Sequence, residues 1–194
     1  MIELIHSITS KEQLMYNFQN LDDLTRTLMI AEIESDIEKG GLYTSRYLTE
    51  TGAKQWGQLL ISAVGDGGPK WLIRELSRGR MKRSATYERQ GRTITKTIVL
   101  WDAENLACSE FNRFYMRALC KRAILEGTQL TVYRAKSVST PRADSYSLIG
   151  TIVEPFSMYE GLLNFENAQR PFAPGSGLSL RIIETETVSN NQTA

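Results

Sequence analysis

The chain contains few of the residues on which catalytic and metal sites usually depend. Its 194 residues include one histidine, His6, and two cysteines, Cys108 and Cys120. A catalytic triad or a multi-histidine metal site would have to use that single imidazole. The cysteines form no Cys-x-x-Cys pair and have no second cluster with which to complete a zinc site. We therefore expect two reduced, half-buried thiols, a histidine without a chemical role, and no cofactor.

Long apolar segments are also absent. No run approaches the roughly 20 apolar residues that span a bilayer, and the first residues lack the basic start and apolar centre of a signal peptide. The content of 41% hydrophobic and 23% charged residues is that of an ordinary globular protein. We expect a cytoplasmic protein, or a component of an assembled virion, that has no membrane partner.

The N-terminal third has a helical pattern. Capping residues and apolar spacing predict helices near 11–18, 21–39 and 53–64, and a short helix over 70–78 that begins after Pro69. From Met81 the apolar period changes from that of a helix to that of a strand. Residues 81–88 and 93–101 flank the sequence Arg-Gln-Gly-Arg and predict a β-hairpin with charged faces.

A long amphipathic helix over 110–126, preceded by a cap at Asp102 or Ser109, is the clearest helix in the chain. Its apolar face includes Phe111 and Ile124, and its basic residues lie on another face. Trp56, Trp71 and Trp101 fall in apolar patterns and are predicted core residues.

The remainder is less regular. It predicts strands over 129–135 and 178–183, helices over 142–148 and 155–163, and a polar tail over 188–194. The fold class is therefore α+β: a helical N-terminal third, a β-hairpin, a long amphipathic helix, and short strands in a small mixed or antiparallel sheet. We expect one domain over 1–187, with a helical lobe over about 10–78 and an α+β part over about 79–187.

The net charge of +1 conceals a partition along the sequence. Residues 1–69 hold 5 Lys and Arg and 10 Asp and Glu, residues 70–142 hold 16 and 6, and residues 143–194 hold 2 and 6. Clustered cations can bind the phosphates of a nucleic acid, or they can meet acidic segments inside the fold or between copies of the chain. Both interpretations stay open, although the near-neutral pI of about 7.7 favours protein contacts.

The residues predicted to interact lie on the long helix and on the segment that leads into the hairpin. They are Arg78, Arg80, Lys82, Arg83, Arg113, Arg117, Lys121 and Arg122. One acidic surface that they could contact is the helix around Glu32, Asp36 and Glu38 of another copy.

One set of residues raises a catalytic alternative. The order Arg134, Ser176 or Ser179, and Glu184-Thr185-Glu186 resembles the Arg, Ser and Glu-x-Glu order of arginine-type ADP-ribosyltransferases. The resemblance implies that Arg134 and Ser179 would help to hold NAD and that Glu186 would act at the transfer step. It covers about a quarter of the chain and includes no Ser-Thr-Ser strand.

The sequence therefore favours a non-enzymatic structural or assembly protein, prokaryotic or from a bacteriophage, that contacts copies of itself or a partner protein. No small-molecule substrate is identified. The first alternative is a nucleic-acid-binding protein that uses the basic segment 70–142, and the second is an ADP-ribosyltransferase-like enzyme.

Overall fold

The fold is described by a computed structural model, which places residues 16–137, 143–163, 172 and 176–183. His6 and the predicted polar tail lie outside the described residues, as does most of the helix predicted over 11–18. The described end of that helix, residues 16–18, is not helical. The N–H of Asn17 donates a 2.8 Å hydrogen bond to the carbonyl of Ala135, so the backbone pairs here with a distant segment.

Three α-helices form the N-terminal part, as the sequence predicts. They are α2 (Asp23–Glu38), α3 (Glu50–Ser62) and α4 (Gly68–Ser77), and a π-helical segment, η1 (Ala63–Gly67), connects the last two. Asp22 and Thr49 begin α2 and α3 because their side chains accept hydrogen bonds from backbone N–H groups of the first turn.

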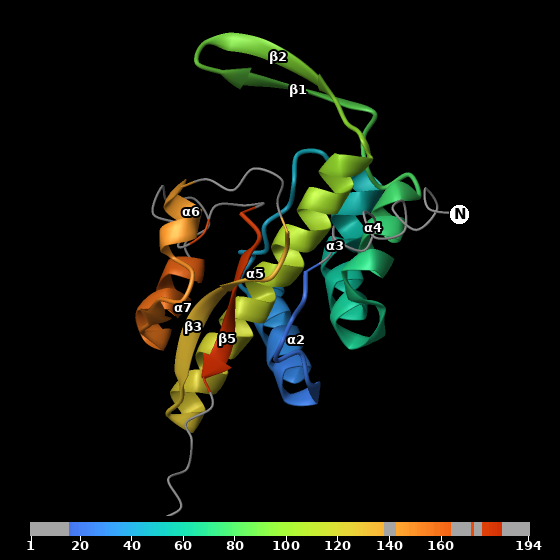
Figure 1. The fold of residues 1–194 in the computed structure, drawn as a ribbon. Helices are drawn as coiled ribbons and strands as arrows, with labels where there is room; N and C mark the ends of the chain where they lie inside the picture. Colours follow the sequence, from blue (N-terminus) through green and yellow to red (C-terminus); the bar gives the residue numbers. More distant parts are fainter. Residues whose placement is uncertain (1–15, 138–142, 164–171, 173–175, 184–194) are drawn as a thin grey trace, which may run out of the picture.

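Helix α5 (Leu100–Glu126) has 27 residues and is about 40 Å long. It begins ten residues before the predicted stretch 110–126 and before both predicted caps, Asp102 and Ser109, and it ends where Gly127 adopts the left-handed conformation. Elements α2, α4 and α7 (Pro155–Leu163) pack around it together with the sheet (Figure 1). Phe111 is fully buried as predicted, whereas the prediction for Ile124 was wrong because its side chain is exposed.

The sheet has three strands in the order β4-β3-β5. Strand β3 (Gln129–Arg134) pairs antiparallel with both β4 (Ile152–Val153) and β5 (Leu178–Ile183). The prediction of a mixed or antiparallel sheet thus resolves to an antiparallel one. Helix α6 (Ala143–Ser147) precedes β4. Buried residues of α2, α3, α4, α5, β3 and β5 belong to one apolar core, so the helical part and the α+β part are packed together.

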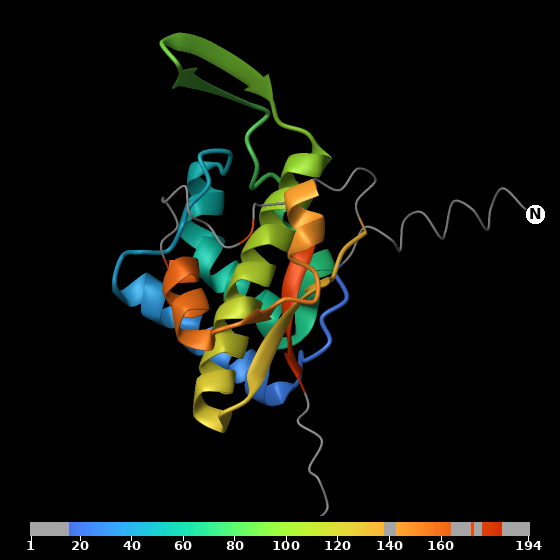
Figure 2. The same ribbon diagram turned by 60° about the vertical axis from the view of Figure 1, so that its left-hand side comes forward.

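The predicted hairpin is confirmed as β1 (Ser84–Arg89) and β2 (Arg92–Thr97), but its second strand is shorter than the predicted 93–101 because residues 100 and 101 begin α5. Its two-residue turn, Gln90-Gly91, has positive φ at both positions, 52° and 71°, as the tight hairpin turn that matches strand twist requires. The hairpin projects from the rest of the molecule beyond the start of α5 in both views (Figures 1 and 2). Among the described helices, none combines the length and the apolar character needed to cross a membrane.

Candidate interaction surface

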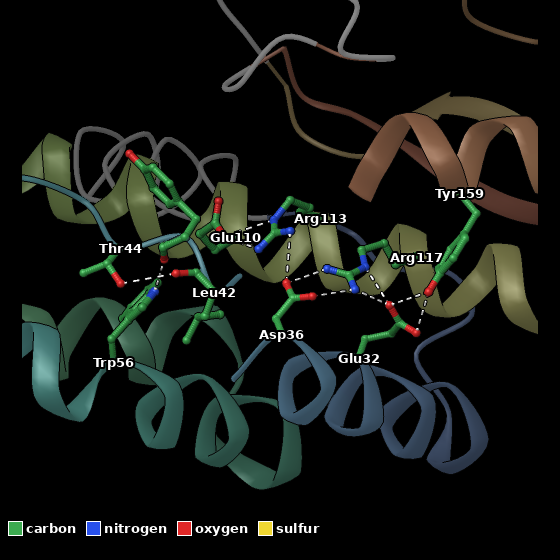
Figure 3. A network of polar contacts seen from close by, with 10 residues as sticks. Glu32, Asp36, Leu42, Thr44, Trp56, Glu110, Arg113, Arg117 and Tyr159 are labelled. Atoms are coloured by element: carbon green, nitrogen blue, oxygen red, sulfur yellow. Dashed lines mark hydrogen bonds and ion pairs between the residues drawn. The ribbon is translucent and has the colours of Figure 1, made fainter. Parts of the chain in front are cut away.

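Arg117, predicted to interact with a partner, is buried in the core and only 1% exposed. Its Nε donates a 2.6 Å hydrogen bond to Glu32, and its two Nη atoms donate bonds of 2.7 and 2.9 Å to Asp36 (Figure 3). Both carboxylates lie on α2 of the same chain, four residues apart, and so they face the same side of that helix. Arg117 therefore joins α5 to α2.

Neighbouring residues extend this pair into a network. Arg113 is buried and contacts Glu110 through two hydrogen bonds of 2.9 and 3.1 Å, and its Nη1 lies 3.5 Å from Asp36 (Figure 3). Glu32 also pairs with Lys121 and accepts a 3.0 Å hydrogen bond from the hydroxyl of Tyr159 on α7. The network thus connects α2, α5 and α7 through charged groups that are mostly removed from water.

The four predicted interaction residues on α5 all pair within the chain. Besides Arg113, Arg117 and Lys121, Arg122 lies 2.5 Å from Asp22 and 2.8 Å from Glu126. The expected contact of this helix with Glu32 and Asp36 of another copy is corrected, because these carboxylates belong to the same chain and are buried. Part of the charge partition in the sequence is accordingly internal to the fold.

The other four predicted residues lie where the hairpin joins the body. Arg78 and Arg80 pair with Glu75 at 2.6 and 3.2 Å, and Lys82 donates a 2.8 Å hydrogen bond to the carbonyl of Arg46. The side chain of Arg83 is exposed. We call residues 82–101 the arm: the hairpin together with its base.

The arm has two different faces, because alternate residues of a strand point to opposite sides. One face carries hydroxyl groups, and Thr86 and Thr95 share a 3.0 Å hydrogen bond across it. The other face is basic and aromatic: the guanidinium of Arg46 lies 4.8 Å from the ring centre of Tyr87, and the ammonium of Lys96 lies 5.0 Å from that of Tyr47. Neither face has the continuous apolar surface of a strand that packs on a core.

Two arginines oppose each other at the tip of the arm. Arg89 and Arg92 are exposed and directly paired across the strands. No ion pair of either residue occurs within the described part of the chain. Like charges directly opposite each other destabilise a strand pair, and an anionic group between them would relieve that repulsion.

The base of the arm exposes three consecutive apolar residues. Val99, Leu100 and Trp101 are 54%, 58% and 59% exposed. The prediction that Trp101 is a core residue was therefore wrong, whereas Trp56 is fully buried. Beside them Lys96 donates a hydrogen bond to the buried carboxylate of Asp102, which raises the pKa of the Lys96 ammonium and fixes β2 to the start of α5.

Of the residues of the catalytic alternative, Arg134 and Ser179 lie on opposite faces of the sheet. Ser179 pairs across the sheet with Tyr133, and Arg134 pairs with Leu178, so Arg134 and Ser179 point to opposite faces. The buried Ser179 hydroxyl donates a 2.7 Å hydrogen bond to the side chain of Asn112. Arg134 donates a 2.9 Å bond to the carbonyl of Ser176. Glu186 lies outside the described residues.

The sequence interpretation did not select the tip arginines or the apolar base of the arm. The Arg-Gln-Gly-Arg turn was a signal for the tip arginines, since a two-residue turn places its flanking residues opposite each other.

Comparison with protein-family models, with curated proteins and with solved structures finds no match to this chain.

Proposed function

We propose that the chain is a non-enzymatic structural or assembly protein, of the cytoplasm or of a virion, that binds another copy or a partner protein through its arm. The observation that supports this most strongly is the projecting hairpin with an exposed apolar base. Within the described residues neither outer edge of the hairpin pairs with a third strand. Two-stranded hairpins are marginal by themselves, and unpaired edges readily bind another chain.

The electrostatics of the arm favour an acidic partner surface. The cations of α5 form ion pairs with carboxylates of α2, of its N-cap and of α5 itself, but Arg83, Arg89 and Arg92 remain exposed on the arm. Complementary charge steers association and fixes its register, while burial of Leu100 and Trp101 would supply most of the affinity.

Sedimentation velocity of two double variants tests this function. Arg89→Glu/Arg92→Glu should dissociate the assembly that the unmodified chain forms at low salt. Lys70→Glu/Arg74→Glu changes the net charge equally at exposed positions of α4 and should leave it intact. Equal sedimentation of both variants and of the unmodified chain would contradict a role for the arm.

A second candidate function is nucleic-acid binding, which the exposed arginines at the tip favour. A two-stranded ribbon fits the major groove of DNA, and Arg89 and Arg92 would contact phosphates or guanines there. The logarithm of the binding constant should fall linearly with the logarithm of the salt concentration, and Arg89→Glu/Arg92→Glu should abolish binding. Absence of any complex with DNA or RNA at low salt would exclude this function.

A further inference from the structure

A second segment of the molecule exposes both apolar and acidic side chains. It consists of the described residues 143–163, which form α6, β4 and α7, and we call it the acceptor surface. Ile152 and Phe156 are each 61% exposed on it. Three further large apolar side chains of this segment are also exposed: Tyr146, Ile149 and Leu163.

The charged residues that the segment itself contains are of one sign. Residues 143–163 contain Asp144, Glu154 and Glu160 and neither lysine nor arginine. The arm contains five Lys and Arg and one Glu, so its charge is +4 against −3 for the acceptor surface. Each surface therefore combines exposed apolar groups with charge that is opposite to that of the other surface.

In both views the hairpin of the arm stands clear of α6 and α7 of its own chain (Figures 1 and 2). The contact is thus available to a second molecule.

We propose that the arm of one copy docks on the acceptor surface of a second copy. The apolar base at Leu100 and Trp101 covers the exposed side chains of Ile152 and Phe156, and the arginines of the arm face the carboxylates. This inference rests on the proposed assembly function and names the partner. Because the two surfaces differ, each copy contributes one arm and one acceptor surface to its neighbours.

Mixing two defective variants tests the pairing. The arm variant is Arg89→Glu/Arg92→Glu, and the acceptor variant is Ile152→Ser/Phe156→Ser, which alters exposed positions and keeps the carboxylate of Glu154. Each variant by itself should associate at least tenfold more weakly than the unmodified chain. An equimolar mixture should form a one-to-one heterodimer, because it restores one intact arm and one intact acceptor surface.

The control is Leu24→Ser/Ile37→Ser, which changes two apolar residues of α2, 48% and 44% exposed, and should assemble normally. Circular dichroism of each variant establishes that it is folded. If the arm variant dissociates while the acceptor variant assembles normally, the acceptor assignment is overturned and the proposed function stands. A mixture that stays monomeric also overturns the assignment. If both variants assemble like the unmodified chain, the proposed function fails as well.

Discussion

Replacement of Arg117 by methionine tests whether the buried network holds α5 against α2. The substitution removes a guanidinium that donates three hydrogen bonds to Glu32 and Asp36 and leaves an apolar chain of similar length. Loss of one partner of a buried ion pair costs about 3–5 kcal/mol, because the opposite charge stays buried without compensation.

The structure places the expected cost toward the lower end of this range. Glu32 keeps Lys121 and Tyr159 as partners, and Asp36 keeps a long contact with Arg113. A loss of about 3 kcal/mol is a large part of the usual 5–15 kcal/mol of a domain. It would lower the melting temperature by roughly 6–12 °C for a chain of this size.

The matched control is Arg122→Met on the same helix. Arg122 pairs with Asp22 and Glu126, whose side chains are far more exposed, so this change should cost about 1 kcal/mol or less. Urea unfolding followed by circular dichroism, at one fixed protein concentration, measures both variants. If Arg117→Met costs no more than Arg122→Met, the network does not stabilise the fold as described.

Three further predictions concern other parts of the fold. Gly52→Ala would place a Cβ 2.4 Å from the carbonyl oxygen of Arg80 and should destabilise the chain by about 1–3 kcal/mol. The control is Gly65→Ala, which should be neutral or stabilising because its Cβ would meet nothing within 4 Å. Equal effects of the two substitutions in thermal unfolding would disprove the close approach at Gly52. Burial raises the pKa of the Cys120 thiol to about 12. At pH 8 a thiol reagent should therefore label this cysteine about three orders of magnitude more slowly in the native chain than in urea. Rapid labelling of the native chain would contradict the burial of Cys120. Hydrogen bonds from the N–H groups of Ser157 and Phe156, that of Ser157 first, hold the pKa of Glu154 below its ordinary value. This cap should therefore stabilise α7 fully at a pH above the ordinary pKa, and its contribution should be lost as the pH falls through the lowered pKa. If the chemical shift of the Ser157 amide, followed by NMR, titrates with a midpoint at or above about pH 4.3, the cap is absent.

Elements with local start and stop signals could be predicted from the sequence. The Gln90-Gly91 turn, Pro69 in the first turn of α4, and Gly127 at the end of α5 each require a particular backbone conformation, and all three lie where the sequence places them. The start of α5 could not be found in this way. Its N-cap is Val99, which has no side-chain oxygen, and the first turn is closed instead by Asp102 accepting from the N–H of Val99.

The position of the basic residues was harder to predict, for a physical reason. Arg113 and Arg117 lie four residues apart on one side of a helix, and that spacing is the same whether the side faces water or the carboxylates of another helix. Glu32 and Asp36 are more than 80 residues from Arg117 in the sequence, so only tertiary packing brings them together.

The mass of the unmodified chain in solution, measured by light scattering at increasing protein concentration in low salt, tests the central claim most directly. A monomer has a mass of 21.9 kDa. Assembly through the arm predicts a mass that rises above this value with concentration and returns to it in high salt or after Arg89→Glu/Arg92→Glu. A constant mass of one chain at high concentration in low salt would contradict the account.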